Sequence, residues 1–319
     1  MRTAGGYAAL VFVLVTLNFV LPRVLPGDPI DSLLAQSATT YVHGEETREA
    51  LERYYGVDEP IVEQYGQYLG KLTRGDLGRS IATNAPVRDE ISRRLPWTLL
   101  LMTSALVLGT AIGVLLGVNG GWKRGRALDR TFLVALLAVR EFPAFLLSTI
   151  LLFVFAVDLD WLPLSGGETP FADFGAWERV VDVARHLALP VLVLTVGLTA
   201  GTYLVMRAGM VAELGSDHLL LGRAKGLRER RLKYGYAARN ALLPVVSLTS
   251  LQVGFLVTGN VLVERVFAYP GLGNLIFESI GSRDYPVISG AFLLVSIGVV
   301  TVHAVTEMIY RRLDPRVAT

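Results

Sequence analysis

Apolar residues gather along this chain in six long stretches, and polar residues fill the segments between them. The stretches run over residues 7–25, 97–118, 131–157, 187–210, 244–263 and 287–310. Each is long enough for a helix of about 20 residues, which at about 1.5 Å per residue crosses about 30 Å of hydrocarbon. None alternates apolar and polar residues as a half-buried strand does. The pattern therefore predicts an all-α protein with six transmembrane helices.

Glycine recurs inside these stretches. Gly109, Gly113 and Gly117 follow one another at intervals of four in the second stretch, and further examples are Gly197, Gly201, Gly254, Gly259, Gly290 and Gly298. Small residues on one helix face let two helix backbones approach closely in lipid. We therefore expect close helix packing at these positions.

The composition supports a membrane protein. The 319 residues are 52% hydrophobic and 18% charged, and the mean hydropathy is +0.48. These values are typical of a polytopic membrane protein rather than of a soluble domain. The absence of cysteine excludes disulfides, a thiol nucleophile and cysteine metal sites. No small-residue cleavage site follows the first stretch, so we expect a retained span rather than a signal peptide.

Basic residues in the connectors predict the orientation, because Lys and Arg are retained on the cytoplasmic side. Residues 119–130 hold Lys123, Arg124, Arg126 and Arg130, and residues 211–243 hold Arg223, Lys225, Arg228, Arg230, Arg231, Lys233 and Arg239. Among the charged residues of 159–186 the acidic ones predominate, with Glu168, Asp173, Glu178 and Asp182. The first two connectors and both termini should therefore be cytoplasmic, and the third should be outside. This topology accounts for the basic residues, and no pattern typical of nucleic-acid binding is left over.

The chain divides on this basis into a first transmembrane helix (1–26), an extracytoplasmic helical segment (27–96) and a five-helix core (97–319). Within the middle segment, Asp58 and Pro60 predict a helix start and the run from Gly75 to Gly78 predicts its end. Between them one helix face carries Ile61, Val62, Tyr65, Tyr68, Leu69 and Leu72. Two interpretations stay open: a cap or landing surface for a ligand carrier, and simple packing on the neighbouring spans.

The connector 211–243 is far longer than a turn between two spans requires. Its sequence is basic and compatible with helix, so we expect it to meet a partner in the cytoplasm. The alternative is a solvated basic connector that only follows the charge asymmetry. The chain holds no Gly-x-x-x-x-Gly-Lys-Ser/Thr loop, so it does not bind ATP in that manner.

Several short motifs occur in a recognisable order. They are Leu25-Pro26-Gly27-Asp28-Pro29, Gly75-Asp76-Leu77-Gly78-Arg79-Ser80, Glu264 with Phe267, Tyr269-Pro270-Gly271-Leu272-Gly273, Arg283-Asp284-Tyr285-Pro286-Val287 and Leu313-Asp314-Pro315-Arg316. With them the chain resembles, over nearly its whole length, the permease subunits of the dipeptide, oligopeptide and nickel ATP-binding cassette importers. The resemblance implies six spans of the type I importer kind in the cell membrane.

The same resemblance implies that connector 211–243 presents a short coupling helix to an ATPase subunit. The residues assigned to this contact are Asp217, Leu220, Leu221, Gly222, Arg223, Ala224, Lys225 and Gly226. Leu220, Leu221 and Gly222 depart from the broader importer pattern, which has an acidic residue and two alanines there. The implied partners are a sister permease, two ATPase subunits and an extracytoplasmic substrate-binding protein. No cofactor, metal or catalytic residue is implied.

Arg140 and Glu141 lie near the middle of the third stretch, just before Pro143. A charge at the centre of a span costs about 2.5 to 3.5 kcal/mol on insertion scales. Neighbours on a helix point about 100° apart, so the two cannot simply pair with each other. We expect Pro143 to kink the helix. We also expect one of the charges to line the pathway or meet the sister permease; an ion pair with another span of this chain is the alternative.

Other polar residues in the stretches carry less weight. Asn18, Gln252 and Asn260 are typical of hydrogen bonds between helices. His303 and Glu307 share a helix face, but two ligands do not complete a metal site. A stand-alone secondary transporter would not need the long basic connector and usually shows internal repeats. A membrane-embedded enzyme would need a catalytic pair that is not evident. The sequence does not distinguish peptides, nickel or other solutes as cargo.

Overall fold

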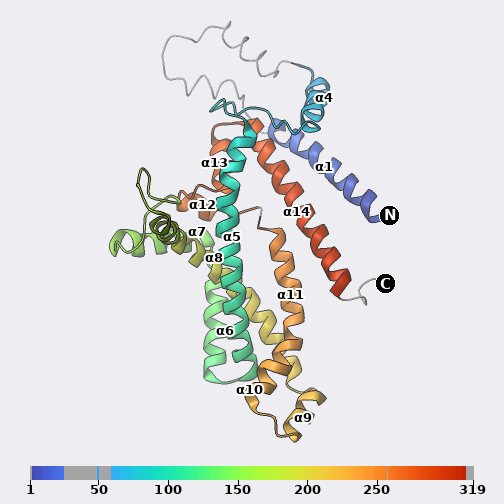
Figure 1. Cartoon of the computed structure of the whole chain (residues 1–319), viewed down its shortest axis with the longest axis vertical. Coiled ribbons are helices and arrows are strands. Elements are labelled where there is room, and N and C mark those ends of the chain that lie inside the picture. Colours follow the sequence, from blue (N-terminus) through green and yellow to red (C-terminus); the bar gives the residue numbers. More distant parts are fainter. Residues whose placement is uncertain (1, 25–48, 50–58, 257, 314–319) are drawn as a thin grey trace. The chain divides into compact units, whose positions relative to one another are not determined.

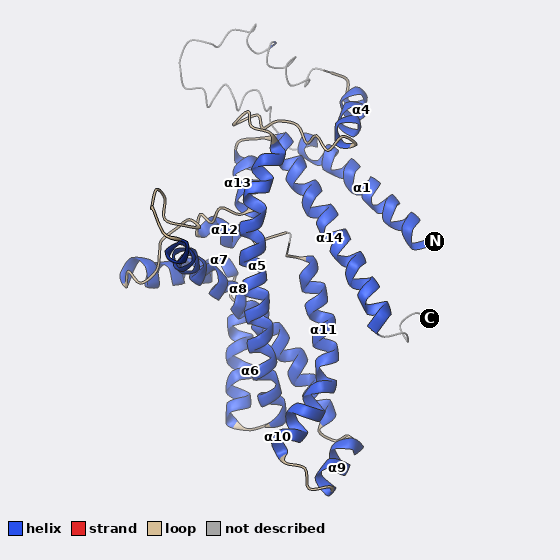
Figure 2. Ribbon diagram, in the orientation of Figure 1, coloured by secondary structure: helices blue, strands red, loops and turns tan. Residues whose placement is uncertain are grey.

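The computed structural model describes residues 2–24, 49, 59–256 and 258–313, and within these ranges the regular elements are helices (Figure 2). Two of them are π-helical turns, η1 (Phe153–Asp158) and η2 (Leu232–Ala237). The same ranges contain no β-strand, only an isolated bridge between Arg79 and Pro86. In chain order the α-helices are α1 (Arg2–Val24), α4 (Ile61–Leu72), α5 (Val87–Trp122), α6 (Ala127–Arg140), α7 (Ala144–Leu152), α8 (Ala176–Glu213), α9 (Asp217–Ala224), α10 (Glu229–Arg231), α11 (Ala238–Gly254), α12 (Val261–Val266), α13 (Leu272–Gly281) and α14 (Tyr285–Leu313) (Figure 1).

The chain forms two compact units. Unit 1 comprises Met1–Pro96 and Gly271–Thr301, and unit 2 comprises Trp97–Pro270 and Val302–Thr319. The two long helices α5 and α14 each pass from one unit into the other. The motif at residues 25–29 and the end of the motif from residue 314 onward lie outside the described residues.

Three of the predicted stretches correspond to single helices that are long and apolar enough to cross a membrane. These helices are Val87–Trp122, Ala176–Glu213 and Tyr285–Val305. The first two are much longer than the stretches that predicted them, because polar residues at their ends continue the helix beyond the hydrocarbon-length core. The apolar run of α1, Gly5–Val20, is shorter.

The third stretch is a broken helix. Asp129–Arg140 and Ala144–Asp158 meet at an angle of 97°, so together they make a fourth span only if the bent pair is counted as one. The break lies at residues 141–143, where Pro143 precedes α7. A proline lacks the N–H that the preceding turn requires and clashes with the carbonyl four residues back. The predicted kink is therefore confirmed, and it is sharper than a simple bend.

The fifth stretch is divided as well. Helix α11 begins six residues before Pro244 and ends at Gly254, and α12 begins only at Val261. Asn260 lies at the start of α12 and accepts a hydrogen bond from the Val263 backbone N–H at 3.1 Å. Its side chain therefore caps α12, and the predicted hydrogen bond between two helices is not what it forms. Asparagine is favoured at this position because its side-chain oxygen satisfies a free N–H group of the first helical turn.

Close packing of α5 on α8 forms the centre of unit 2. A Cβ atom added to Gly109, Gly113 or Gly117 would lie 2.6 Å from a side-chain Cβ atom of α8, namely that of Leu198, Thr202 and Met206 respectively. The four-residue spacing places these glycines on one helix face, where the missing side chains admit the neighbouring helix. The predicted role of these three glycines is confirmed. Gly197 and Gly201, by contrast, have open space where a Cβ would lie.

Substituting Gly113 by alanine should destabilise unit 2 by about 1 to 3 kcal/mol, because the new methyl group overpacks the contact with Thr202. The matched control is Gly201→Ala, which adds the same methyl group where nothing lies within 4 Å. The melting temperatures of the two variants in detergent, monitored by size-exclusion chromatography after heating, measure the difference in stability. Equal melting temperatures for the two variants would contradict the close approach of α5 and α8.

In unit 1, α4 packs on α1. The Phe19 ring lies 5.0 Å from the ring of Tyr65 and 5.4 Å from that of Tyr68, and the Tyr65 hydroxyl is 2.7 Å from the Thr16 hydroxyl. The helix begins after Pro60 as predicted, and the chain leaves it through Gly75, whose φ of +71° suits glycine. A second cluster joins the first turns of α5 to α13 and α14, with Val87, Ile91, Leu272, Ile276 and Val287 at its centre.

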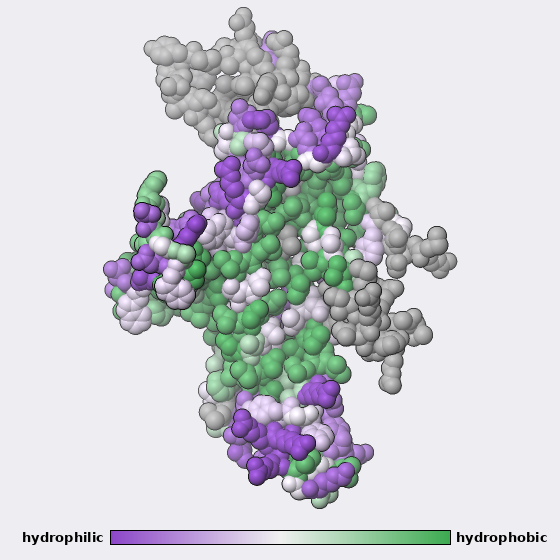
Figure 3. Space-filling model, viewed as in Figure 1, coloured by the Kyte–Doolittle hydropathy of each residue, from purple (hydrophilic) through white to green (hydrophobic). Residues whose placement is uncertain are grey.

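The surface of unit 2 changes character along its length. On the face shown in Figure 3, hydrophobic residues cover the middle of α5 and α6, and hydrophilic residues gather at the end formed by α9 and α10. This is the distribution expected when a bundle crosses lipid and carries a polar connector in water.

Candidate functional site

The connector between α8 and α11 contains a separate short helix. Helix α9 begins after Ser216, carries Asp217 in its first turn, and ends at Ala224 with Lys225 in the C-cap position. Gly226 then has a φ of +76°, a left-handed conformation that glycine adopts without strain. The residues predicted for the coupling contact therefore lie on one short helix and its C-terminal turn.

The inner face of α9 packs on the same chain. Leu219 is 0% exposed, and a Cβ atom on Gly222 would lie 2.5 Å from Cδ2 of Leu232 in η2. Leu219 and Leu232 belong to a buried cluster that also contains Met206 and Met210 of α8. Gly222 therefore serves as the point of close approach between α9 and η2, and it does not share the outward position of its neighbours.

The outer face of α9 is exposed and partly apolar. Leu220 and Leu221 are 53% and 56% exposed, and Arg223, Ala224 and Lys225 beside them are exposed too. Leu220 and Leu221 point away from the buried face of α9 that carries Leu219, so they have no packing role within the connector. Two such leucines flanked by cations make a surface suited to a groove in another protein.

Polar contacts tie the connector to the long helices. The Lys233 ammonium in η2 donates to the Asn119 side-chain oxygen near the end of α5. The Glu213 carboxylate at the end of α8 lies 3.0 Å from the His218 ring on α9 and accepts from the Asn240 amide on α11 at 3.2 Å. These contacts link α9 to α8, α8 to α11, and η2 to α5.

A buried ion pair joins α6 to α8 at the same end of unit 2. The Arg207 guanidinium donates two hydrogen bonds of 2.7 Å to the Asp129 carboxylate, which also accepts from the Tyr203 hydroxyl at 3.2 Å and the Gly125 backbone N–H at 3.0 Å. The Asp129 side chain is 3% exposed and that of Arg207 is 22% exposed. Sequence reasoning missed this pair, because the two residues are far apart in the chain. Two signals were available: Asp129 just before the third stretch and Arg207 inside the fourth.

Arg140 and Glu141 lie at the end of α6 and in the break that follows it, and both are exposed. Within the described part of the chain neither forms an ion pair or a side-chain hydrogen bond. Two charges without partners at a helix break, in a segment of apolar residues, are available to water or to another subunit.

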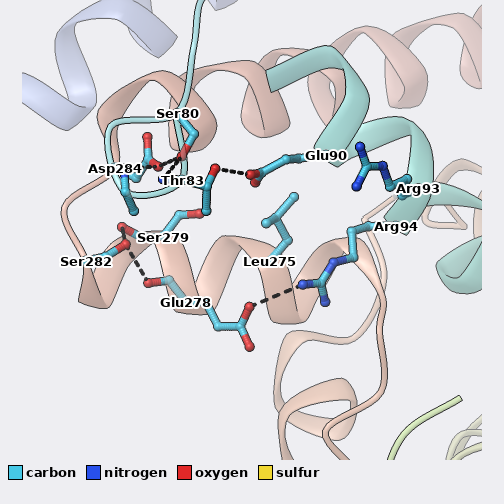
Figure 4. Close-up of a pocket in the computed structure, with 11 residues that line it drawn as sticks. Ser80, Thr83, Glu90, Arg93, Arg94, Leu275, Glu278, Ser279, Ser282 and Asp284 are labelled. Carbon is cyan, nitrogen blue, oxygen red and sulfur yellow. Dashed lines mark hydrogen bonds and ion pairs between the residues drawn. The ribbon is translucent and has the colours of Figure 1, made fainter. Parts of the chain in front are cut away.

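Two of the sequence motifs meet in unit 1. The buried Asp284 carboxylate, just before α14, accepts hydrogen bonds from the Ser80 hydroxyl and from the backbone N–H groups of Ile81 and Ala82, the last two at 3.1 and 3.2 Å (Figure 4). It also accepts from the Val287 N–H at 3.4 Å, which caps α14. Asp284 is therefore an acceptor that fixes the turn after α4 against the start of α14.

A further motif contacts α5 at Trp97 and Thr98, where the unit 2 part of this helix begins. The fully buried Glu264 carboxylate accepts from the Thr98 hydroxyl at 3.0 Å, and the Tyr269 hydroxyl donates to the Trp97 carbonyl at 3.2 Å. Burial, and then the nearby Glu264 carboxylate, raise the pKa of the Tyr269 phenol. It therefore stays protonated and remains a donor at neutral pH. The contacts of Glu264 and Tyr269 therefore hold this part of the motif against α5 at Trp97 and Thr98.

The His303 ring packs against Gly254. A Cβ atom added to Gly254 would lie 2.8 Å from Nε2 of His303. The side chain of Glu307, its predicted companion, lies outside the described residues. Among the residues whose side chains are described, no group of three His, Cys, Asp or Glu could hold a metal ion.

Comparison with known proteins agrees with this arrangement. The family model described as "Binding-protein-dependent transport system inner membrane component" matches residues 109–319. A putative peptide permease protein of Brucella suis biovar 1 is 38% identical over 309 residues, covering 97% of this chain and 95% of the relative. The di/tripeptide transport system permease protein DppB of Pseudomonas aeruginosa is 35% identical over 330 residues, covering 99% and 97%. The glutathione transport system permease protein GsiC of Escherichia coli strain K12 is 33% identical over 312 residues, covering 98% and 96%.

The matched region contains the connector with α9, the Asp129–Arg207 pair and the broken third stretch. The likeness to the relatives extends over unit 1 as well, since it covers nearly the whole length of both chains. The chain is a multi-pass membrane permease and belongs to the family of inner membrane components of binding-protein-dependent transport systems.

Proposed function

We propose that this chain is the permease subunit of an ATP-driven importer and that it forms, with a sister permease, the pathway for peptides. The observation that carries the proposal is its similarity, over nearly its full length, to proteins named as peptide, di/tripeptide and glutathione permeases. The exposed Leu220 and Leu221 on α9 support the same assignment, since an outward apolar surface on a cytoplasmic connector is what a separate ATPase would contact.

The proposed topology has six spans, with both termini, residues 119–130 and connector 211–243 in the cytoplasm. In it α1, the bent pair α6–α7 and the divided pair α11–α12 count as spans alongside α5, α8 and α14. The partners are two cytoplasmic ATPase subunits, which hydrolyse ATP, and an extracytoplasmic substrate-binding protein. The basic residues of the two cytoplasmic connectors support this orientation.

In the proposed mechanism, closure of the ATPases on ATP moves α9. Its inner face transmits the displacement through Leu219 and Gly222 to η2, and the contacts of Glu213 and Lys233 extend it to α8, α11 and α5. Coupling between two sites is typically about 1 to 3 kcal/mol, enough to bias a bundle that already has inward-open and outward-open states. The bundle itself is then the two-state element.

Reconstitution with the cognate subunits tests the proposal. We expect ATP hydrolysis in proteoliposomes to rise when the substrate-binding protein is loaded with peptides, and not when it is loaded with nickel or sugar. Stimulation by nickel alone would identify a nickel importer. Uptake of peptide by the isolated chain, without ATPase subunits, would instead identify a secondary transporter.

For Arg140 and Glu141 we propose that at least one lines the pathway or contacts the sister permease, because neither has a partner within the described chain. Arg140→Leu and Glu141→Leu should each leave the chain folded, since both residues are exposed, and at least one should lower transport about tenfold. Peptide uptake normalised to assembled complex measures this. Normal assembly and normal uptake in both variants would exclude the role.

A further inference from the structure

A polar hollow of about 260 Å³ lies in unit 1 beside the Asp284 contact. Three parts of the chain line it: the turn after α4 with Ser80, Ala82 and Thr83, the first turns of α5 with Glu90, Arg93 and Arg94, and the segment from α13 to α14 with Leu275, Glu278, Ser279, Ser282 and Asp284 (Figure 4). None of the predicted site residues lies here, and neither the proposed pathway nor the coupling contact uses it.

The acidic groups of this hollow already have donors. Asp284 accepts the four hydrogen bonds described above. Glu90 accepts from the Thr83 hydroxyl, and Glu278 accepts from the Asn274 amide at 3.0 Å. Each of the three carboxylates therefore accepts at least one hydrogen bond from a neutral group.

The basic groups, in contrast, have unused donors. Arg93 has no hydrogen-bond or ion-pair partner among the described residues, and Arg94 has one contact, to the Glu278 carboxylate at 3.6 Å. A guanidinium carries five N–H donors in a planar fork that matches a carboxylate. Figure 4 shows both arginines on α5, with Arg94 directed toward Glu278. The hollow therefore offers donors to an anion that is not present in this chain.

We propose that the hollow receives an acidic side chain of the extracytoplasmic substrate-binding protein, with Arg93 and Arg94 as the contacts to its carboxylate. The volume is below the range of about 300 to 1,000 Å³ typical of small-molecule sites, so it suits one side chain better than a whole peptide. The N-terminal turns of α5 face outside in the proposed topology, because the chain reaches the cytoplasmic connector 119–130 at the other end of this helix. The inference rests on the proposed function for the existence of this partner.

The test measures ATP hydrolysis by the full complex in proteoliposomes while the peptide-loaded binding protein is titrated. In the Arg93→Gln/Arg94→Gln double variant, the binding-protein concentration giving half-maximal stimulation should rise at least about tenfold, since charge-assisted contacts are lost. Added salt should raise this concentration less than in the wild type. Arg88→Gln is the control: Arg88 is an exposed arginine in the first turn of the same helix, and it does not line the hollow.

A cysteine placed in the hollow identifies the occupant. The chain has no cysteine, so Ala82→Cys introduces a single thiol at a residue that lines the hollow together with both arginines. The substrate-binding protein should protect it from a membrane-impermeant maleimide, and free peptide should not. Protection by free peptide alone would overturn the proposal and assign the site to peptide in transit.

The outcomes separate this inference from the proposed function. If the wild-type complex shows no stimulation by any loaded binding protein, the proposed function fails. If the wild type is stimulated and the assembled double variant has an unchanged half-maximal concentration, the function stands and the carboxylate contact is wrong.

Discussion

Asp129→Ala should destabilise the chain by about 3 to 5 kcal/mol, the usual cost of removing one partner from a buried ion pair. The carboxylate is 3% exposed and receives two hydrogen bonds from Arg207, so its loss leaves a guanidinium with little access to water. The substitution also removes the acceptor for the Gly125 N–H at the start of α6. Most of the chain should then fail to accumulate in folded form.

The yield of monodisperse protein after detergent extraction, and its melting temperature, measure this loss. A double variant separates the ion pair from packing: Asp129→Leu/Arg207→Met replaces both charges by apolar groups of similar size. We expect it to recover much of the lost stability, because an apolar pair is often as stable as the buried charges that it replaces. If the double variant is less stable than Asp129→Ala, the contribution of this site does not come from the ion pair.

One local feature of connector 211–243 could be anticipated from the sequence. The resemblance implied a short helix there, and the structure has α9 at Asp217–Ala224, followed by Gly226 in a left-handed conformation. The distinction between Leu219, buried, and Leu220 and Leu221, exposed, could not be predicted. It depends on Leu232 of η2, which folds back beneath α9 and closes on Gly222.

Contacts between distant segments were the least predictable part. The sequence motifs around Ser80 and Asp284 were each recognised, but their hydrogen bond joins residues 204 positions apart. The Asp129–Arg207 contact spans 78 positions. Helical periodicity reports which face of one helix is apolar, and it carries no information about which polar group will lie opposite. Pro143 did indicate the break in the third stretch, whereas hydropathy located the fifth stretch but not the break within it.

Replacing Leu220 and Leu221 together by aspartate should reduce ATP-dependent peptide uptake at least about a hundredfold. Both side chains are exposed in the chain alone, so two carboxylates there should not disturb its fold. In the proposed complex, however, they enter a groove of the ATPase. Burying a leucine side chain contributes about 1.5 to 3 kcal/mol, so losing two removes about 3 to 6 kcal/mol from the contact, and each 1.4 kcal/mol is a tenfold change in affinity.

The assay compares uptake and the amount of ATPase that co-purifies with equal amounts of permease. Leu220→Met/Leu221→Met is the matched control, since methionine keeps the volume and apolar character and should retain both readouts. Leu219→Asp should behave differently from either, because a carboxylate in that buried position prevents α9 from packing on Leu232 and lowers the yield of folded chain. Normal co-purification and uptake in the double aspartate variant would mean that the ATPase does not contact this face of α9. The connector would then be only a solvated loop between two spans.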